Sequence, residues 1–390
     1  MAQSETSSIL EIFKAETNWG ETPAGGTWFT GRITGETLEE SKEVVVSNEI
    51  NSNAEKTAVK DVFRTVSGDV NFELTYATWN TWFEALLRKT GVTVSYTAAT
   101  IAAASGDNSI NDSATLFPAG IVAGMWIRIA GFTGTVGNNG VARVISRTTA
   151  KIVIEGAALG GITLVTDAEG EAVTITAFMV RNGTTKKSLV WERQYLDISK
   201  YMYVNGIRLD KCAIEVNSKQ IVTASFSVFG KKAPSSATSV VGGGSITAAN
   251  SNEPMTATGN VSAINEGGAV ITVAAKNIKV NVSNNLRYKD QIGSKYAADV
   301  GYGTFEVTGT FTLYFEDLVA YQKFENHTAS SLSWKMTDDS GNVVVISIPR
   351  LFYTKASIPA PGENQDIMLP MEFRGVRDST LGCTMQIDCI

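Results

Sequence analysis

Histidine and cysteine are scarce in this chain of 390 residues. His327 is the only histidine, and the three cysteines are Cys212, Cys383 and Cys389. One histidine cannot build a multi-histidine metal site, and as a catalytic base it would need a nucleophile and an orienting group that no pattern supplies. Three cysteines without C-x-x-C spacing argue against a disulfide framework or a zinc site. We therefore predict no catalytic, cofactor-binding or metal-binding residues, and reduced cysteines that are buried or lie in the tail.

Charged residues and long apolar runs are also rare. Charged residues make up 18% of the chain, with a net charge of −6. A stable nucleic-acid binder usually presents a basic face, whereas basic residues here occur in pairs such as Lys186-Lys187. No stretch approaches the roughly 18 apolar residues that a membrane helix needs. The residues Met1 to Glu5 lack the features of a signal peptide, so we expect folding in a reducing cytoplasm.

What is abundant is the pattern of half-buried strands. Val70, Phe72 and Leu74 alternate with polar residues, and Phe311, Leu313 and Phe315 do the same. This alternation predicts an all-β fold whose strands bury one face. Two short helices interrupt it. The first carries aromatic and leucine side chains at helical spacing from Trp79 to Leu87, with Thr78 as the expected N-cap and Gly91 as the expected end. The second would start after Asp317 and carry Leu318, Tyr321 and Phe324.

An internal duplication is the most informative feature. The strand 66–74 recurs as 307–315, with Gly309 lying 241 residues after Gly68 (309 − 68). Farther on, 188–191 recurs as 331–334, with an offset of only 143 residues (334 − 191). The sequel 207–209 matches 349–351 with a similar offset, and 226–230 parallels the strand that ends at Phe373. The first copy therefore contains about 98 extra residues (241 − 143) between its helix and its second matching strand.

The extra residues and the duplication together predict the domain organisation. Residues 92–187 are rich in Ala, Gly, Ile and Thr, with strands expected at 126–129 and 151–154 and a tight-turn signal at 138–140. We interpret them as an inserted outer β-domain. The first unit would comprise 1–91 and 188–232, and the second 255–390. The glycine- and serine-rich residues 233–254 predict a flexible connector between them, not a phosphate loop, because no lysine follows the glycines.

Three polar features receive structural interpretations. Asp338–Asn342 resembles a calcium loop faintly, but it lacks the spacing and the terminal glutamate of that motif, so a hairpin turn is expected. Glu39-Glu40 has no partner pair at a recognisable spacing. The charged segment 36–62 lies between strand signals and is predicted to be an arm or long loop that reaches an adjacent ring, with an ordinary solvated hairpin as the alternative.

Several stretches, taken in order, resemble a family of siphophage tail tube (major tail) proteins. They are 19–23 (Trp-Gly-Glu-Thr-Pro), 44–50, the strand around Gly68 with the tryptophan-bearing helix, 187–195 and 203–206. The inserted segment, with Gly131-Phe132 and 138–140, resembles small β-domains of other phage tail proteins. The likeness covers most of the chain outside 92–187, and its motifs consist of strands and turns without reactive residues.

The resemblance implies two tail-tube-like β-sandwich units, each with a short flanking helix, whose sheets join those of neighbouring chains in stacked rings. The partners implied are further copies of the chain, a tape measure protein, a tail terminator and distal tail proteins. The phage DNA would pass through a carboxylate-lined channel without specific binding, and no membrane is involved. The location implied is the virion tail, assembled in the host cytoplasm. Because the duplication gives one chain two of the six expected units, we predict three chains per ring, a pseudo-hexamer.

Two other classes of function stay open from the residues alone. A surface-exposed β-rich adhesin or decoration protein would share this composition, although no secretion signal favours it. A glycan hydrolase would need paired carboxylates in a cleft, which sequence cannot exclude.

Overall fold

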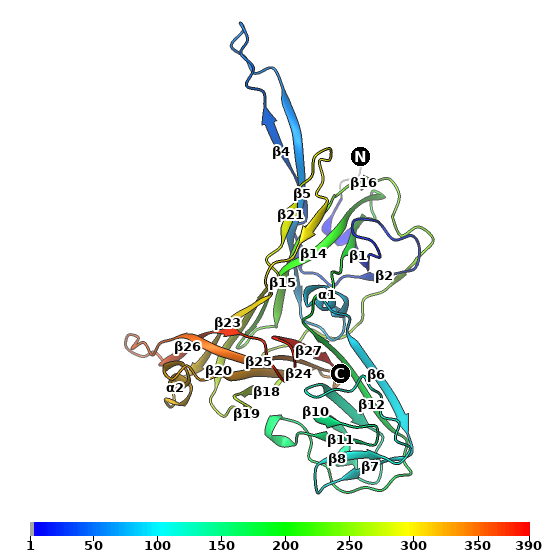
Figure 1. Ribbon diagram of the computed structural model, residues 1–390, viewed down its shortest axis with the longest axis vertical. Helices are drawn as coiled ribbons and strands as arrows, with labels where there is room; N and C mark the ends of the chain where they lie inside the picture. The colour runs from blue at the N-terminus through cyan, green and yellow to red at the C-terminus, as the bar shows by residue number, and fades with distance from the viewer. Residues whose placement is uncertain (1–3) are drawn as a thin grey trace.

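A computed structural model describes residues 4–390 and confirms the all-β fold, with two α-helices among the described residues. None of the helices in this part of the chain is long and apolar enough to cross a membrane. Figure 1 shows an elongated molecule with a narrow hairpin at one end and the insert at the other.

Ten strands form two sets with the same internal order. In each set, five antiparallel strands lie side by side, and each is hydrogen-bonded to the next. The first array is β1 (Ile9–Ala15), β13 (Leu189–Tyr195), β14 (Lys200–Asn217), β15 (Thr223–Gly230) and β5 (Val59–Glu73). The second array is β18 (Val261–Glu266), β24 (Ser330–Thr337), β25 (Val343–Ala356), β26 (Met368–Gly375) and β23 (Glu306–Tyr314).

The registers of the two arrays agree residue by residue. Val66 lies opposite Gly230 in the first array, and Val307 opposite Gly375 in the second. The predicted strand match 66–74 to 307–315 is therefore reproduced in three dimensions. The N–H of Glu16 donates to Ser188 O at 2.9 Å, and that of Gly267 donates to Ser331 O at 2.9 Å. This second agreement extends the duplication to the strands β1 and β18, which the sequence comparison did not reach.

One part of the sequence alignment was wrong. The registers place Leu209 opposite Val228 and Tyr353 opposite Phe373, so Leu209 corresponds to Tyr353 and not to Leu351. The strand beside β14 carries Trp191, and the strand beside β25 carries Trp334. Between the residue opposite this tryptophan and the position of Leu209 or Tyr353, β25 has two more residues than β14. The ladders of both arrays are bulged here, and bulges let a strand gain residues while its neighbours keep their register.

The two arrays form one sheet. Strand β20 (Ala275–Ser283) pairs with β23 on one side and with the C-terminal half of β14 on the other. In the first array its place is taken by β3 (Gly35–Glu36) and the start of β4 (Glu39–Val46), which pair with β5. One face of this sheet is apolar and buried, and the other is polar, as strand alternation requires.

Helix α1 (Asn80–Leu86) packs its aromatic side chains into the core of the first array, as predicted. Trp79 and Trp82 are fully buried, and Trp82 meets Trp191 edge to face at 5.4 Å. The expected caps were wrong. The helix N-cap is Trp79, and the left-handed residue that ends the helix is Arg88 (φ 55°) in place of Gly91.

Helix α2 (Val319–Glu325) follows β23 as α1 follows β5. The N-cap is Leu318, one residue after the predicted Asp317, whose carboxylate nevertheless accepts the N–H of Val319 at 2.9 Å. Its apolar face is less buried than that of α1, because Tyr321 and Phe324 are only partly covered and Leu318 is exposed.

The inserted residues fold around their own core. Their strands are β6 (Val92–Ala98), β7 (Ile101–Ala104), β8 (Ser109–Asp112), β9 (Trp126–Ala130), β10 (Gly140–Arg147), β11 (Lys151–Ile154) and β12 (Val173–Arg181). The predicted strands 126–129 and 151–154 are confirmed. The turn signal at 138–140 is not a two-residue hairpin, because β9 and β10 are joined by the longer loop 131–139. The side chain of Asn138 is instead buried and bonded to Val165.

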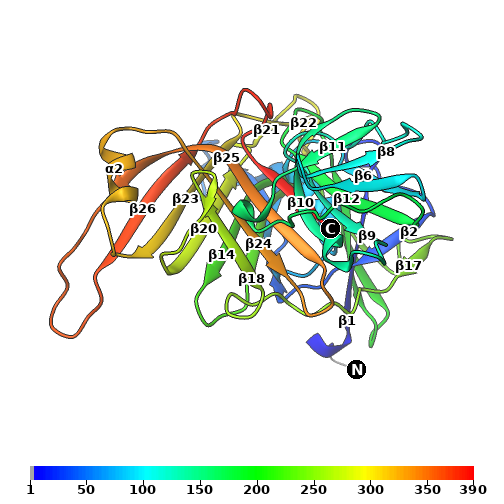
Figure 2. The same cartoon turned by 90° about the horizontal axis from the view of Figure 1, so that it is seen from below.

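The C-terminal strand β27 (Gln386–Cys389) joins this insert to the second array. It pairs with β12 on one side and with β25 on the other. Seen from below, the second array and the insert lie on opposite sides of the C-terminus (Figure 2). The insert therefore interrupts the first array in sequence but packs against the second.

The segment 233–254 is not the loose connector that its glycines predicted. Its strands β16 (Ser235–Ser236) and β17 (Ser245–Thr247) pair with β14 and with β2 (Thr27–Thr30), and Val241 is buried. Arg32 donates to the backbone and side chain of Asn250, at 3.2 and 3.1 Å. The segment thus follows the first array closely before the chain enters the second.

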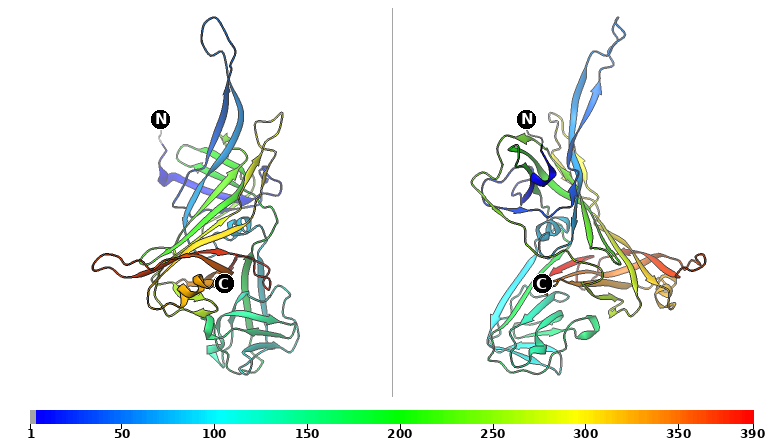
Figure 3. Two further views of the ribbon diagram at one scale, coloured as in Figure 1. Left: turned by 60° about the vertical axis from the view of Figure 1, so that its left-hand side comes forward. Right: turned by 180° about the vertical axis from the view of Figure 1, so that it is seen from behind.

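Two hairpins extend from the sheet in the same direction. The longer is the arm, residues 41–65, formed by β4 and by β5 before it enters the sheet at Val66, and it stands clear of the body in Figures 1 and 3. The shorter is formed by β21 (Arg287–Lys289) and β22 (Asp299–Gly301). They touch where the N–H of Arg64 donates to Lys295 O at 2.8 Å.

Candidate assembly surfaces

The surfaces that could carry a function are the junction between the arrays, the polar face of the shared sheet, the arm and the open sheet edges. We first describe the junction, because the duplication makes it a template for contacts with other chains. Seven residues of β14 pair there with seven of β20, from Lys211 opposite Ser283 to Asn217 opposite Asn277. On the buried face Ile214 meets Val280, and on the polar face Glu215 forms an ion pair with Lys279.

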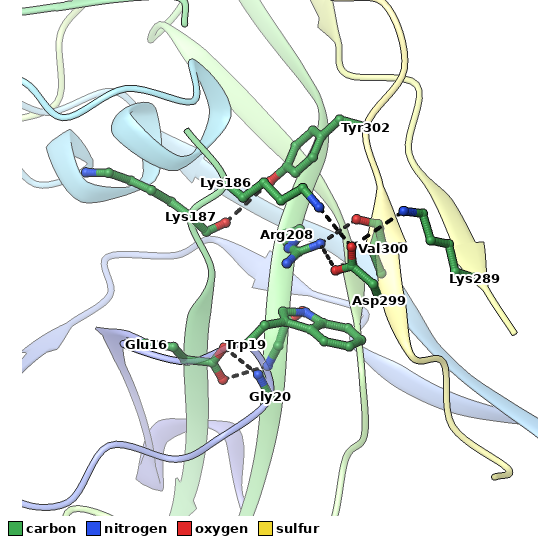
Figure 4. Close-up of polar contacts among 11 residues, drawn as sticks. Glu16, Trp19, Gly20, Lys186, Lys187, Arg208, Lys289, Asp299, Val300 and Tyr302 are labelled. Atoms are coloured by element: carbon green, nitrogen blue, oxygen red, sulfur yellow. Dashed lines mark hydrogen bonds and ion pairs between the residues drawn. The ribbon is translucent and has the colours of Figure 1, made fainter. Parts of the chain in front are cut away.

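A buried arginine fastens the second hairpin to the first array (Figure 4). Arg208 of β14 is 4% exposed and donates to Asp299 Oδ1 at 2.6 Å and to Val300 O. Asp299 also binds Lys186 at 2.8 Å and approaches Lys289 at 3.7 Å. Burial alone would raise the pKa of Asp299, but the hydrogen bonds from Lys186 and Arg208 outweigh it and lower the pKa to about 2. The cluster is therefore a structural clamp, in which the Asp299 carboxylate is ionised at neutral pH.

The Trp-Gly motif near the N-terminus lies against this clamp. The ring of Trp19 lies 5.0 Å from the Arg208 guanidinium, and its Nε1 donates to Gly206 O at 2.9 Å. The Glu16 carboxylate accepts the N–H of Gly20 at 2.9 Å and of Gly206 at 2.7 Å. Both glycines have left-handed φ values, 75° and 70°, and a Cβ on Gly206 would clash with Trp19. Two stretches that carry the family resemblance, 19–23 and 203–206, thus form one contact.

The polar face of the shared sheet is rich in hydroxyl and amide groups and nearly neutral. Its charged side chains are Glu39, Asp69, Glu73, Glu215, Glu306 and Glu372, with Lys211, Lys279, Lys355 and Arg374. Three of the four cations lie in ion pairs with carboxylates of the same face. Lys279 pairs with Glu215, Lys355 with Glu372 at 3.0 Å, and Arg374 with Glu306 at 3.1 Å. Such a face presents few free charges to a ligand.

The arm exposes apolar side chains that the sequence pattern did not emphasise. Ile50, at its tip, is 98% exposed, and Val44, Val45 and Val59 are each more than half exposed. An isolated two-stranded ribbon is only marginally stable in water, and valine side chains that stay exposed on it add no stability through burial. Residues 36–62 therefore lie largely in a β-hairpin that extends from the body with apolar side chains exposed on it.

A buried carboxylate lies where the insert meets the second array. Asp388 of β27 is fully buried, accepts the N–H of Trp126 at 3.2 Å and binds Gln386 at 2.7 Å. Burial raises the pKa of Asp388 to about 7, against the opposing effect of these hydrogen bonds. Trp126 and Leu159 of the insert pack with Val343 and Val345 of β25 in a separate small core. The insert is thus attached by both apolar and polar contacts.

A groove of about 670 Å³ lies beside the open edge at β3. It contains Glu11, which is 7% exposed and 3.5 Å from the Arg193 guanidinium, and Glu36, which is paired with the same arginine. Burial raises the pKa of Glu11 to about 7, although Arg193 acts in the opposite direction. Paired carboxylates in a cleft were the feature that a hydrolase would need. Here the guanidinium of Arg193 lies beside both carboxylates.

The remaining candidate residues have structural positions. His327 is exposed and stacks on Phe352. Asp338 closes the predicted hairpin turn by accepting the N–H groups of Ser340 and Asn342. Glu40 binds Arg64 at 2.9 Å. All three cysteines are buried and free. Across residues 4–390, no three His, Cys, Asp or Glu side chains come together as a metal site would require.

Sequence reasoning missed two elements. The Arg208–Asp299 pair joins residues 91 positions apart, and no local signal marks either partner. Strand β27 was also missed, because its alternating Gln386 and Asp388 resemble the solvent face of a strand while both are buried.

Comparison with known families gives one match. The family described as "Phage tail tube protein" matches residues 12–375, a range that runs from β1 to the end of β26 and includes the insert. No curated protein matches the chain.

Proposed function

Because the chain belongs to the phage tail tube protein family, we propose that its copies form the stacked rings of a long, non-contractile phage tail tube through which the genome is ejected. The protein would act as a structural component of the virion tail, assembled in the host cytoplasm, and not as an enzyme. The observation that supports this most is the single sheet shared by the two arrays, apolar on one face and polar on the other. A sheet of this kind can be continued by further copies until it closes.

In this proposal the polar face lines the channel. The sequence predicted a wall of carboxylates that repels DNA. The wall proposed here has six acidic and four basic side chains, with three of the cations paired. Phosphate groups bind where they release counterions to free lysine or arginine. DNA would slide along this wall because few cations are free, and the hydroxyl-rich surface would make no lasting contact.

The two arrays would supply two of six similar units in each ring, so three chains complete it. The arm would then reach the adjacent ring and bury its exposed valines and Ile50 against another copy. The insert, which occurs only in the first array, would face outward as three protrusions per ring. A tape measure protein, a tail terminator and distal tail proteins are the further partners we propose.

Electron microscopy of the purified protein at high concentration tests the proposal. We expect tubes of regular diameter. An adhesin or decoration protein, the main alternative, would remain as discrete particles, and that result at all concentrations would contradict the assignment.

A further inference from the structure

We infer that the ring closes by one specific strand pairing, in which residues 356–360 of one chain pair antiparallel with residues 36–40 of the next. This inference rests on the proposed function and adds the residues and the register. It uses the β14–β20 junction inside the chain as a template for the junction between chains.

The template leaves two edges open. In the first array the C-terminal half of β14 is covered by β20 of the second array. Its counterpart, the C-terminal half of β25, has β26 on one side and, among residues 4–390, no strand on the other. The counterpart of β20 is β3 with the start of β4, which pairs with β5 on one side only. A chain thus carries one open edge at each end of its shared sheet. One edge corresponds to β14 and the other to β20, the two strands that pair at the junction inside the chain.

The length of β25 supports a missing partner. Strand β14 continues to Asn217 along β20, and the registers make residue 361 the counterpart of Asn217. Strand β25 nevertheless ends at Ala356. The five residues that follow, 357–361, are those that a neighbouring strand would pair.

Two prolines in this segment fit an edge that points outward. In the template, Asn284 N–H donates to Asp210 O and Ser218 N–H to Lys276 O, so even-numbered residues of β14 face β20. Their counterparts are Ala356, Ile358 and Ala360. Pro359 and Pro361 take the alternate positions, whose N–H groups would face β26. They weaken pairing within the chain and leave every outward donor intact.

The template also fixes the register. Ile278 lies opposite Phe311, and Glu36 lies opposite Val70, so Glu36 is the counterpart of Ile278. Cys212 lies opposite Phe226, and Ala356 lies opposite Met371, so Ala356 is the counterpart of Cys212.

Transferring the β14–β20 pairs places Ala356 opposite Glu40, Ser357 opposite Glu39, and Ile358 opposite Leu38. In the isolated chain the N–H of Leu38 donates to the Glu36 carboxylate at 2.7 Å, a bond that pairing with the neighbour would replace.

The groove beside β3 has a matching occupant. In the junction within the chain, the turn after β14 covers the start of the second array, where Ala257 N–H donates to Gln220 O at 2.9 Å. The corresponding turn of the second array is 362–367, which follows the open edge. Thr6 and Thr34, which line the groove, are the counterparts of the residues that the first turn touches. The turn 362–367 of one chain would therefore cover the groove, and with it Glu11, of the next.

A cross-link tests the register. Ser357 and Glu39 are both exposed and form a pair without mutual hydrogen bonds, in which Cα atoms lie about 4.5 Å apart and a disulfide can form. The variant combining Ser357→Cys with Glu39→Cys should form intermolecular disulfides on oxidation, visible on a non-reducing gel and absent from soluble monomer. The matched control combines Ser357→Cys with Glu43→Cys, which is also exposed but lies about 13 Å farther along the strand.

The outcomes separate the inference from the function. Rings or tubes with at least tenfold more cross-linking in the 357–39 variant than in the control support the register. Tubes with equal or no cross-linking in both overturn the register and leave the tail-tube function standing, whereas absence of any rings or tubes from the wild-type chain overturns the function itself. A second variant, Ile358→Pro, removes an outward donor and should give folded monomer that forms no rings. Normal rings from it would contradict the pairing independently.

Discussion

Replacing Asp299 with asparagine should loosen the second hairpin from the first array. The change keeps the shape of the side chain but removes the charge that faces the buried Arg208 guanidinium at 2.6 Å. The pKa of Asp299 is lowered from 3.8 to about 2, which corresponds to roughly 2.4 kcal/mol at 1.36 kcal/mol per unit. The Asp299 side chain is 27% exposed, so solvent screening reduces this value. Leaving the buried Arg208 guanidinium without its counter-ion increases the loss of stability. We expect a loss of about 2 kcal/mol in the free energy of unfolding at pH 7.

The assay is denaturant unfolding of soluble chain, combined with hydrogen exchange over 287–301. The variant should lose protection in that hairpin while α1 keeps its own. Because the pKa of Asp299 is lower in the folded state, its contribution is present above pH 3.8 and disappears as the pH falls through about 2. The difference between wild type and variant should therefore shrink in acid.

Lys289→Gln is the matched control, because its ammonium lies 3.7 Å from the same carboxylate but is half exposed. An exposed pair of this kind contributes less than about 0.5 kcal/mol. Equal losses in both variants, or a stability of the Asp299 variant within about 0.5 kcal/mol of wild type, would refute the reasoning.

Three further predictions concern the arm, the insert and the groove. Replacing the arm tip, residues 47–57, with Asn-Gly should leave the folded chain and single rings intact but abolish stacking, whereas equal hydrogen-exchange protection of 36–62 in free chain and tubes would contradict a role for the arm. Replacing 92–187 with a Gly-Ser linker should still permit tubes. Val345, which packs on the insert, is changed to serine in this variant to limit aggregation. A folded chain that forms no tubes would place the insert in the ring contact. Glu11 has a pKa raised by burial from 4.5 to about 7, so the stability linked to its protonation is present below pH 4.5 and lost as the pH rises through 7. The variant Glu11→Gln should therefore gain on wild type by up to about 3 kcal/mol between pH 5 and 8, and parallel pH profiles in thermal melts would exclude this carboxylate as the cause.

Local patterns in the sequence were sufficient for the strands and for the duplication. Alternation at Val70, Phe72 and Leu74 depends only on which face of a strand is buried, and that information lies within a few residues. The aromatic face of α1 was predicted for the same reason. The helix end was not, because a left-handed Arg88 is selected by packing and by hydrogen bonds that no single-residue preference encodes.

Contacts between distant segments were beyond the sequence. The pairing of β27 between β12 and β25 depends on where the insert docks, and nothing near Asp388 indicates that it is buried. The polar clamp at Arg208 is hidden in the same way. The repeated strands, by contrast, carried long-range information, because one array reports on the other. They predicted two copies, and the registers then supplied a template for contacts that the sequence could not specify.

A helical reconstruction of assembled tubes would show how many chains close a ring and which surface lines the channel. We expect rings of three chains in which six similar arrays surround the channel, with the polar sheet face toward the lumen and three outer protrusions per ring. Six chains or six protrusions per ring would contradict the pseudo-hexamer while leaving the tube in place. A lumen lined by any surface other than the shared sheet would contradict the proposed arrangement of the chains in the tube.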